Sequence, residues 1–315
     1  MPDVTGEAFA AAMAALPGGA ALPGQRLGIA VSGGPDSIAL LDLAAAYAPG
    51  RTEAATVDHG LRAEAAAEAV MVARWCDGQG IPHAILRPSV PITGSVQARA
   101  RAVRYALLDA WMDERGLDWL LTAHHADDQI ETMLMRLNRS SGVAGLAGIR
   151  ARRGRVVRPL LGFRKAALEE YVRARGIPHV ADPSNNDERY DRARLRAALA
   201  GADWLDPSSA ARSAAALADA DSALTWSAQR LYADLVVPHG DGLRLASTDL
   251  PHEYLRRLLA LMLAALTPDS PEPRGERIDD AVFRLRAGDK ISIGACIATG
   301  GTVWTLRQAP PRRTG

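Results

Sequence analysis

Residues 32–37, with the sequence SGGPDS, combine two hydroxyls, two glycines and one carboxylate between an apolar run and a helical pattern. A plain connection from a strand to a helix needs far fewer small polar residues. Glycines let the main chain approach a ligand closely, and serine hydroxyls can donate hydrogen bonds to phosphate oxygens. The N–H groups and the dipole of the following helix favour anions at its first turn. This segment therefore predicts a phosphate site.

Asp36 suggests that a cation is also bound at this site, because a carboxylate repels phosphate unless a cation lies between them. Proteins usually hold Mg²⁺ with one or two carboxylates together with the phosphates of a substrate. The segment lacks the lysine of a GxxxxGK[ST] loop, and it does not match GxGxxG. A glycine turn capped by Ser or Asp is the alternative interpretation, and it involves no ligand.

A second polar cluster, HHADDQIE at residues 124–131, passes from the end of an expected strand into a helix. Helical spacing brings Asp128 within about one turn of both His124 and Glu131. Acids in a first helical turn interact well with the helix dipole, but this does not account for the histidines or for Glu131. Zinc binding is another interpretation, although the cluster has neither an HExxH arrangement nor a cysteine ligand. A cationic amine or a second Mg²⁺ suits it better.

Two further segments are candidates for contact with an anion. Asp58 and His59 follow the second expected strand, where they either face a nucleotide or cap a turn. Arg101 and Arg104 lie one turn apart on an expected amphipathic helix, either as a solvated face or with Arg104 bound to phosphate. Between residues 136 and 175, eleven Arg or Lys accompany two acids, which suggests a polyanionic partner.

The expected strands and helices alternate along the N-terminal part of the chain, and these polar residues lie in or next to them. Strand-like runs occur at residues 27–31, 54–57, 84–86 and 119–122, and helical patterns at 37–46, 63–79, 96–115 and 127–138. The alternation predicts an α/β fold with a mostly parallel, helix-covered sheet. Ligands of such sheets bind beyond the carboxyl ends of the strands, which is where the polar residues lie.

The residue composition and the pattern of expected elements change near residue 205. Helical stretches rich in Ala and Leu follow at 208–235 and 252–266, and the segment ISIGACIATGGTVWTLRQ is expected to form two strands joined at Gly300-Gly301 as a hairpin. We therefore predict an N-terminal catalytic domain, residues 1–204, and a smaller C-terminal domain of helices and a β-hairpin, residues 205–315.

Bulk properties limit the class of protein. The chain has 315 residues and a net charge of +1, and its two cysteines form no CxxC pair. This argues against a disulfide scaffold, a zinc ribbon or a cysteine-ligated cluster. The longest strongly apolar run, residues 258–266, is about half a bilayer span, and the N-terminus lacks the basic residues of a signal peptide. We expect a cytoplasmic protein without membrane association; its oligomeric state stays open, a homodimer included.

Between about residues 25 and 196, several motifs together resemble the tRNA(Ile)-lysidine synthetase family of the PP-loop ATP pyrophosphatase superfamily. They are SGGPDS, VDHGLR, ARAVRY, TAHHADDQIET, RSSGVAGLAGI, RPLL and DPSNNDERYDRARLR. The HHxDDQxET and DPSN stretches are more specific within the superfamily than the first loop. The sequence departs from the family at Ala193, where Asn is usual, and at Ser141, or Ser140 in another alignment, where Gly is usual. Neither change falls in the ATP motif.

The resemblance implies a sheet of PP-loop ATPase type, ATP and Mg²⁺ as cofactors, and a two-step reaction. ATP adenylates the C2 carbonyl oxygen of the wobble cytidine in a tRNA(Ile) with a CAU anticodon, and pyrophosphate leaves. The ε-amine of free L-lysine then displaces AMP and forms lysidine. The region after residue 205 would bind the tRNA.

The expected ATP-binding residues are Ser32, Gly33, Gly34, Pro35, Asp36, Ser37, Asp58 and His59, with Asp36 also the metal ligand. The expected catalytic residues are Asp36, Arg104, His124, Asp128, Glu131 and Arg196. By resemblance, Asp128 and Glu131 are associated with lysine binding, and Arg104 stabilises charge during adenyl transfer. Arg196 lies near the reaction centre, and His124 is a candidate base for the amine.

Three other functions agree less well with the sequence. A PP-loop tRNA thiolase would use the same adenylation, but the CxxC motifs are missing. An amidating relative such as GMP synthetase would carry a glutaminase-like domain, which the sequence does not suggest. A non-catalytic RNA-binding protein on a degenerate scaffold is disfavoured because Asp36, Asp128 and Glu131 are intact.

Overall fold

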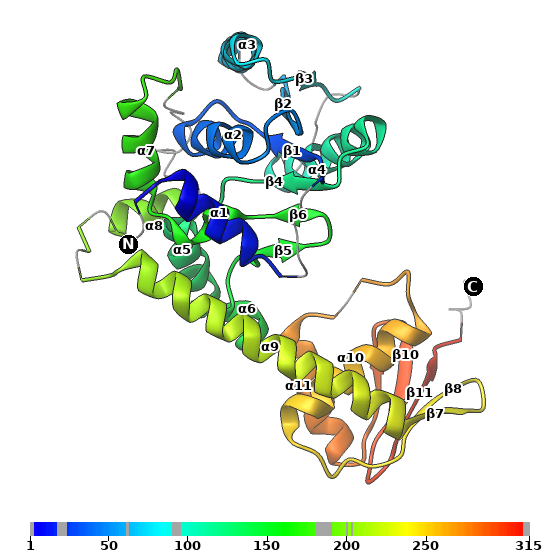
Figure 1. Ribbon diagram of the computed structural model, residues 1–315. Helices are drawn as coiled ribbons and strands as arrows, with labels where there is room; N and C mark the ends of the chain where they lie inside the picture. The colour runs from blue at the N-terminus through cyan, green and yellow to red at the C-terminus, as the bar shows by residue number, and fades with distance from the viewer. Residues whose placement is uncertain are drawn as a thin grey trace. The chain divides into compact units, whose positions relative to one another are not determined.

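The computed structural model describes residues 3–17, 24–60, 63–89, 96–180, 191–199, 201–202, 204–271 and 273–310. The DPSNNDER stretch lies outside the described residues, as do the side chains of residues 191–193. The chain divides into two compact units, Met1–Ala218 and Asp219–Gly315. The division falls inside the long helix α9, Pro207–Leu235, whose start coincides with the change of texture in the sequence (Figure 1).

The N-terminal unit contains a six-stranded sheet, here called sheet A, in the order β3-β2-β1-β4-β6-β5. Its strands are β1 Leu27–Ala30, β2 Thr52–Val57, β3 His83–Leu86, β4 Trp119–Leu121, β5 Arg152–Arg153 and β6 Val156–Val157. Every pairing is parallel except that of β5 with β6. The predicted mostly parallel α/β sheet is confirmed. The β5–β6 pair was not predicted, because two-residue strands show no periodic pattern.

Helices pack on both faces of sheet A. They are α1 Gly6–Ala14, α2 Pro35–Tyr47, α3 Ala63–Gly78, α4 Val96–Arg115, α5 Ala126–Leu137, α6 Val143–Leu146, α7 Lys165–Ala174 and α8 Asp191–Leu199, with a 3-10 turn at Pro159–Gly162. One core joins α1, α2, α3 and α7 through buried residues such as Phe9, Leu40 and Leu168. A second core joins α4 to the sheet through Leu108 and Met112. Burial of these apolar side chains fixes where the strands end.

The C-terminal unit contains a five-stranded antiparallel sheet, here called sheet B, in the order β7-β8-β11-β10-β9. Its strands are β7 Val236–His239, β8 Gly242–Leu245, β9 Lys290–Ile293, β10 Cys296–Thr299 and β11 Trp304–Gln308. Helices α10, His252–Leu266, and α11, Gly275–Arg286, pack on one face of this sheet. Their shared core includes Leu259, Val282 and Trp304, which are fully buried.

The predicted hairpin around Gly300-Gly301 is present, because β10 and β11 pair antiparallel, but its connection is longer than the expected two residues. The segment forms three strands, and the tight connection is Gly294-Ala295 between β9 and β10. Strands β10 and β11 are joined by residues 300–303. A Cβ on Gly300 would lie 2.0 Å from the carbonyl oxygen of Leu285, and the Gly301 N–H donates to that oxygen at 2.8 Å. The two glycines therefore allow close approach to the end of α11.

Within the described residues, no helix combines the length and the apolar character needed to cross a bilayer.

Gly28 in β1 tests the packing of sheet A against α4. A Cβ at this position would lie 2.8 Å from Cζ3 of Trp111, whose ring is held in the core. We predict that Gly28→Ala lowers the free energy of unfolding by about 1–3 kcal/mol through overpacking. Gly78→Ala is the matched control, because nothing lies within 4 Å of its added Cβ. Urea denaturation of both variants checks this, and equal stabilities would contradict it.

Candidate active site

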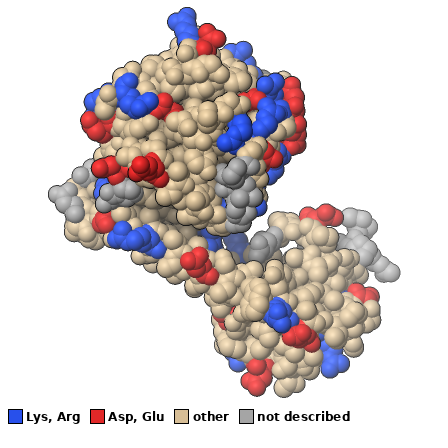
Figure 2. Space-filling model, viewed as in Figure 1, with Lys and Arg blue, Asp and Glu red and all other residues tan. Residues whose placement is uncertain are grey.

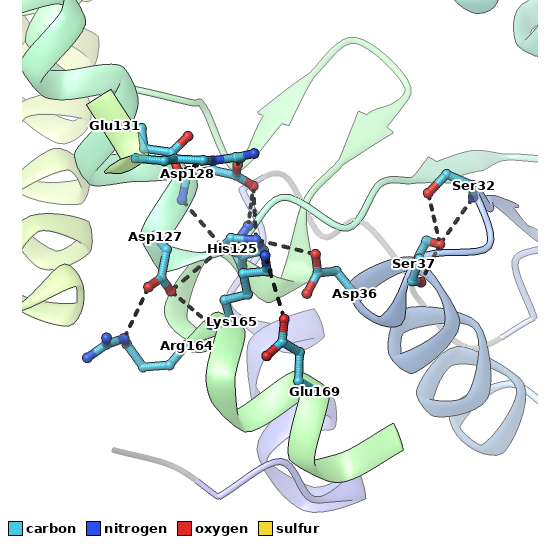
Figure 3. A network of polar contacts seen from close by, with 12 residues as sticks. Ser32, Asp36, Ser37, His125, Asp127, Asp128, Glu131, Arg164, Lys165 and Glu169 are labelled. Atoms are coloured by element: carbon cyan, nitrogen blue, oxygen red, sulfur yellow. Dashed lines mark hydrogen bonds and ion pairs between the residues drawn. The ribbon is translucent and has the colours of Figure 1, made fainter. Parts of the chain in front are cut away.

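The loop between β1 and α2 is ordered by its two serines. The Ser37 hydroxyl donates to the Gly34 carbonyl oxygen at 2.9 Å and accepts from the Ser32 N–H at 3.1 Å, and the two hydroxyl oxygens are 3.2 Å apart (Figure 3). Gly33 adopts φ +87°, a left-handed conformation that favours glycine. Gly34 is the N-cap of α2 and Pro35 follows it, so no side chain caps this helix. The first turn of α2 thus presents its N–H groups to a ligand.

This loop lines a cleft of about 630 Å³. The predicted site residues that line the cleft come from four elements: Ser32, Gly34, Pro35, Asp36, Ser37, Arg104, His124 and Asp128. A smaller cavity of about 200 Å³ shares Ser32 and Arg104 with the cleft and extends along β2 to His59 and Glu68. The two neighbouring cavities are thus lined by the phosphate loop, Arg104 and Asp128 near the carboxyl ends of the strands, whereas Glu131 and Arg196 line neither cavity.

His125 connects the loop to α5. The buried imidazole is the N-cap of α5, and its Nε2 lies 3.5 Å from Oδ2 of both Asp36 and Asp128. Its Nδ1 lies 3.7 Å from Oδ2 of Asp127 (Figure 3). Burial alone would lower the pKa of His125, but the three acids outweigh burial and raise it above its ordinary value. Sequence reasoning assigned no role to His125; its signal was the second histidine of the HH pair.

Asp36 directs only one of its two carboxylate oxygens at His125. The other, Oδ1, is buried and has no hydrogen-bond partner among the described residues. A buried carboxylate oxygen without a partner costs free energy unless a cation or donor approaches it. Among the described residues, no cluster of three or more His, Cys, Asp or Glu side chains could hold a metal ion by itself. A metal at Asp36 would therefore depend on ligand oxygens as well.

Asp128 and Glu131 on α5 face Arg196 of α8. Arg196 lies 2.5 Å from Oε1 of Glu131 through Nε and 3.4 Å from Oδ1 of Asp128 through Nη2. Although burial lowers the pKa of Arg196, the hydrogen bond to Glu131 and the two negative charges raise it overall. Both acids are buried, so the three groups form a compact cluster beside the cleft.

His124 is held as a neutral imidazole. Burial, followed by the positive charges of Arg158, Arg101 and Arg104, lowers the pKa of His124 to about 4, and Asp128 opposes that shift. Its Nδ1 lies 3.0 Å from the Thr122 hydroxyl. Above about pH 5 the ring is able to accept a proton, but as a weak base.

Arg104 projects into both cavities from α4. Burial lowers its pKa, and it makes no ion pair or hydrogen bond with any described residue. A desolvated guanidinium without a carboxylate partner is poised to bind an anion. Its position therefore suits a phosphate group better than a purely structural role.

Asp58 makes contacts within a turn, whereas its neighbour His59 lines a cavity. Oδ1 of Asp58 accepts from the Gly60 N–H at 3.0 Å, and Oδ2 accepts from Arg87 at 3.1 Å. The Gly60 hydrogen bond, and then Arg87, hold the pKa of Asp58 below its usual value. Asp58 is absent from the lining of both cavities, whereas His59 lines the smaller one. The turn-capping interpretation accounts for these contacts of Asp58.

Lys165 and Glu169 on α7 also line the cleft and were not singled out from the sequence. Their side chains lie 3.6 Å apart, and Oδ2 of Asp127 accepts from the Lys165 main-chain N–H at 2.8 Å (Figure 3). The available signal was composition, because this chain has lysine only at positions 165 and 290. Asp127 thus joins α7 to the same cluster as His125.

Part of the basic segment 136–175 organises the main chain. Arg136 donates to the carbonyl oxygens of Gly145 at 2.6 Å and Gly148 at 2.9 Å, and Arg158 donates to that of Arg150 at 2.8 Å. On the face seen in Figure 2, positive and negative side chains are interspersed over the N-terminal unit. The expected polyanionic partner of this segment stays a prediction.

Comparison with known proteins agrees with this geometry. A family model described as the PP-loop domain matches residues 8–202. The tRNA(Ile)-lysidine synthase of Zymomonas mobilis subsp. mobilis is 41% identical over 297 residues, covering 91% of this chain and 90% of its own. That of Novosphingobium aromaticivorans is 43% identical over 303 residues, covering 93% of this chain and 91% of its own.

A solved structure, the U34-tRNA thiolase NcsA from Methanococcus maripaludis with its [4Fe-4S] cluster, matches with a TM-score of 0.55. It is 16% identical and covers 67% of this chain and 77% of its own, so it shows the fold alone. The family match and the two synthases extend over most of the chain, including the loop, α5 and the cleft. The chain belongs to the tRNA(Ile)-lysidine synthase family, PP-loop ligases that use ATP to modify tRNA.

Proposed function

We propose that this enzyme makes lysidine at the wobble cytidine of a tRNA(Ile) with a CAU anticodon. In the first step, the C2 carbonyl oxygen of the cytidine attacks the α-phosphorus of ATP, and pyrophosphate leaves. In the second step, the ε-amine nitrogen of free L-lysine attacks C2, the C2–O bond breaks and AMP leaves. The amine loses one proton to a base. Cytoplasmic location is part of the same proposal.

The contrast between the two sides of one cleft carries this proposal. On one side, the SGGPDS loop and Arg104 offer N–H groups, hydroxyls and an unpaired guanidinium to phosphates. On the other side, Asp128 lines the cleft, and Glu131, which does not line it, belongs to the same buried acidic cluster; both carboxylates suit an ammonium group. A reaction that joins a nucleotide phosphate to a cationic amine needs both environments within one cavity.

Adenyl transfer depends on stabilising negative charge that develops on the phosphates. Ser32, Ser37 and the first turn of α2, which line the cleft, would bind the leaving pyrophosphate, and Arg104 would bind the transferred phosphate. The smaller cavity beside His59 would hold the nucleoside part of ATP. Buried main chain along β1 and β2 excludes water from that side.

Asp36 fits a role as the protein ligand of Mg²⁺, because its Oδ1 is buried without a partner. When bound, the ion would neutralise phosphate charge and so supply Lewis-acid stabilisation of the leaving group. His125 orients Asp36 by holding the other oxygen, Oδ2.

The amine step needs recognition of lysine and removal of a proton. Asp128 and Glu131 would bind the lysine, and the positive charge of Arg196 offsets part of their negative charge. His124 is neutral and lines the cleft, so it is the group available to accept the proton.

Asp36→Asn should reduce tRNA-dependent pyrophosphate release by about 10²-fold or more, because it removes the charge that would hold the ion. Binding of the tRNA itself should change little. Asp58→Asn is the matched control: it should lower stability but spare release at saturating ATP, because Asp58 lies outside both cavities. Equal loss of tRNA binding and pyrophosphate release in the Asp36 variant would refute the assignment.

Glu131→Gln should raise the KM for lysine by about tenfold or more while changing the KM for ATP less than about threefold. The reason is that the buried carboxylate would contact the ammonium group and not the phosphates. Steady-state incorporation of radiolabelled lysine into a tRNA transcript measures both constants. A larger effect on ATP than on lysine would show that the acidic cluster binds something else.

The pH dependence of the amine step follows from the lowered pKa of His124. A histidine whose pKa is about 4 is neutral at every pH from 6 to 8, so its titration should not appear there. The free lysine amine, with a pKa near 10.4, becomes more abundant as pH rises, and kcat/KM for lysine should increase up to about tenfold per pH unit. An inflection near pH 6.5 that disappears in His124→Gln would contradict this.

A further inference from the structure

Lys165, the first residue of α7, lines the cleft together with the SGGPDS loop and has no role in the proposed function. Among the described residues its ammonium group has one partner, Glu169 of the next turn, whose Oε1 lies 3.6 Å from Nζ (Figure 3). Both side chains are 39% exposed, and ion pairs this accessible to water contribute little to stability. The ion pair therefore does not by itself account for a lysine at this position.

The packing of α7 against α2 brings Lys165 to the phosphate side of the cleft. The Tyr171 hydroxyl donates to Oδ2 of Asp42 on α2 at 2.6 Å, and Nε of Arg175 lies 2.9 Å from the same oxygen. These contacts hold the C-terminal half of α7 against α2. The first turns of the two helices both line the cleft, α2 with Asp36 and α7 with Lys165. A ligand bound at the first turn of α2 therefore lies within the cavity that Lys165 also faces.

The type of residue at position 165 is informative, because the chain uses arginine almost everywhere else. All but two of its 37 Lys and Arg side chains are Arg, and the other lysine, Lys290, lies on β9 of the C-terminal unit. A lysine ammonium is a compact charge on a flexible stem, whereas a guanidinium forms a planar, bidentate pair with a carboxylate. Lys165 is therefore suited to leave Glu169 and to reach an oxygen of a bound phosphate.

The leaving pyrophosphate concentrates several negative charges in one part of the cleft, and the donors of the SGGPDS loop are neutral. Arg101 and Arg104 line the cleft from α4, and Arg104 would bind the transferred phosphate. Arg173 also lines the cleft, but it pairs with Glu170 on its own helix. Lys165 is thus the cation that α7 offers to pyrophosphate, and hydrogen bonds from a charged donor are about twice as strong as those from a neutral one.

We propose that Lys165 binds the β- and γ-phosphates of ATP and the pyrophosphate that leaves, and that Glu169 holds its ammonium group in the cleft when no phosphate is bound. This assignment rests on the proposed function for the identity of the reaction. The carboxylate of Glu169 and the phosphate oxygens compete for one ammonium group, so binding of pyrophosphate breaks the ion pair.

Because the chain has lysine only at positions 165 and 290, the wild-type protein can be tested by chemical labelling. N-hydroxysuccinimidyl acetate acetylates accessible lysine side chains, and peptide mass spectrometry reports the two positions separately. Saturating ATP or pyrophosphate should slow acetylation of Lys165 about tenfold or more, because the ammonium group is then held by phosphate oxygens. AMP, which lacks the β- and γ-phosphates, should leave the rate nearly unchanged. Lys290 is the internal control and should react equally in every sample.

Substitutions separate phosphate binding from a structural role of the ion pair. In calorimetric titrations of the full-length protein with pyrophosphate, K165M should raise Kd about tenfold or more, because a charge-assisted hydrogen bond is lost. K165R keeps the charge and should raise Kd less than about threefold. E169Q removes the competing carboxylate and should leave Kd unchanged or lower it. K290M is the matched control, since it removes the other lysine, and it should not change Kd.

Three results would overturn the proposal: protection of Lys165 by AMP equal to that by ATP, no protection by pyrophosphate, or the same loss of pyrophosphate binding in K165M and E169Q. The last result would show that the ion pair acts only on the structure of α7, and circular dichroism melting of each variant would report the matching loss of stability. Failure of the wild-type protein to form lysidine would refute the proposed function instead. Both experiments would still report on Lys165, since they require neither tRNA nor free lysine.

Discussion

Three carboxylates from two separate segments converge on the buried imidazole of His125, and their attraction to it offsets the cost of burying them together. Asp36 belongs to the loop after β1, while Asp127 and Asp128 belong to α5. Asp127 also accepts from the main chain at Lys165, so the start of α7 is held as well (Figure 3). One side chain therefore bridges the phosphate loop and the acidic cluster, in addition to the apolar core that holds these elements.

Around this centre, opposite charges are separated within one cleft. Arg104 lies on the side of the phosphate loop without a partner, and Arg196 lies on the side of the acids and neutralises part of their charge. A cavity arranged in this way distinguishes an anionic from a cationic substrate before any reaction takes place. His124 adds a neutral group to the lining of the cleft, because burial and the nearby arginines keep that ring from becoming protonated.

Much of this arrangement could be predicted from the sequence, because it depends on local patterns. Apolar runs followed by polar residues allowed β1, β4 and the loops after them to be predicted. The spacing of Asp128 and Glu131 predicted that both side chains lie on one face of a helix. The role of His125 could not be predicted from the sequence, because it depends on contact with Asp36, which is distant in sequence. The same limit applies to Gly300 and Gly301, which resembled a hairpin turn but accommodate α11. Strands β7 and β8 were also not predicted, although they form a local hairpin whose turn is Gly240-Asp241.

The guanidinium of Arg104 also bears on the stability of the ligand-free fold. A charge removed from water without a counterion makes the ligand-free fold less stable than it would otherwise be. Any phosphate-bearing ligand that binds there relieves this cost in the folded chain alone, so it shifts the equilibrium away from the unfolded chain. Ligand binding and folding would then be coupled thermodynamically through this one side chain.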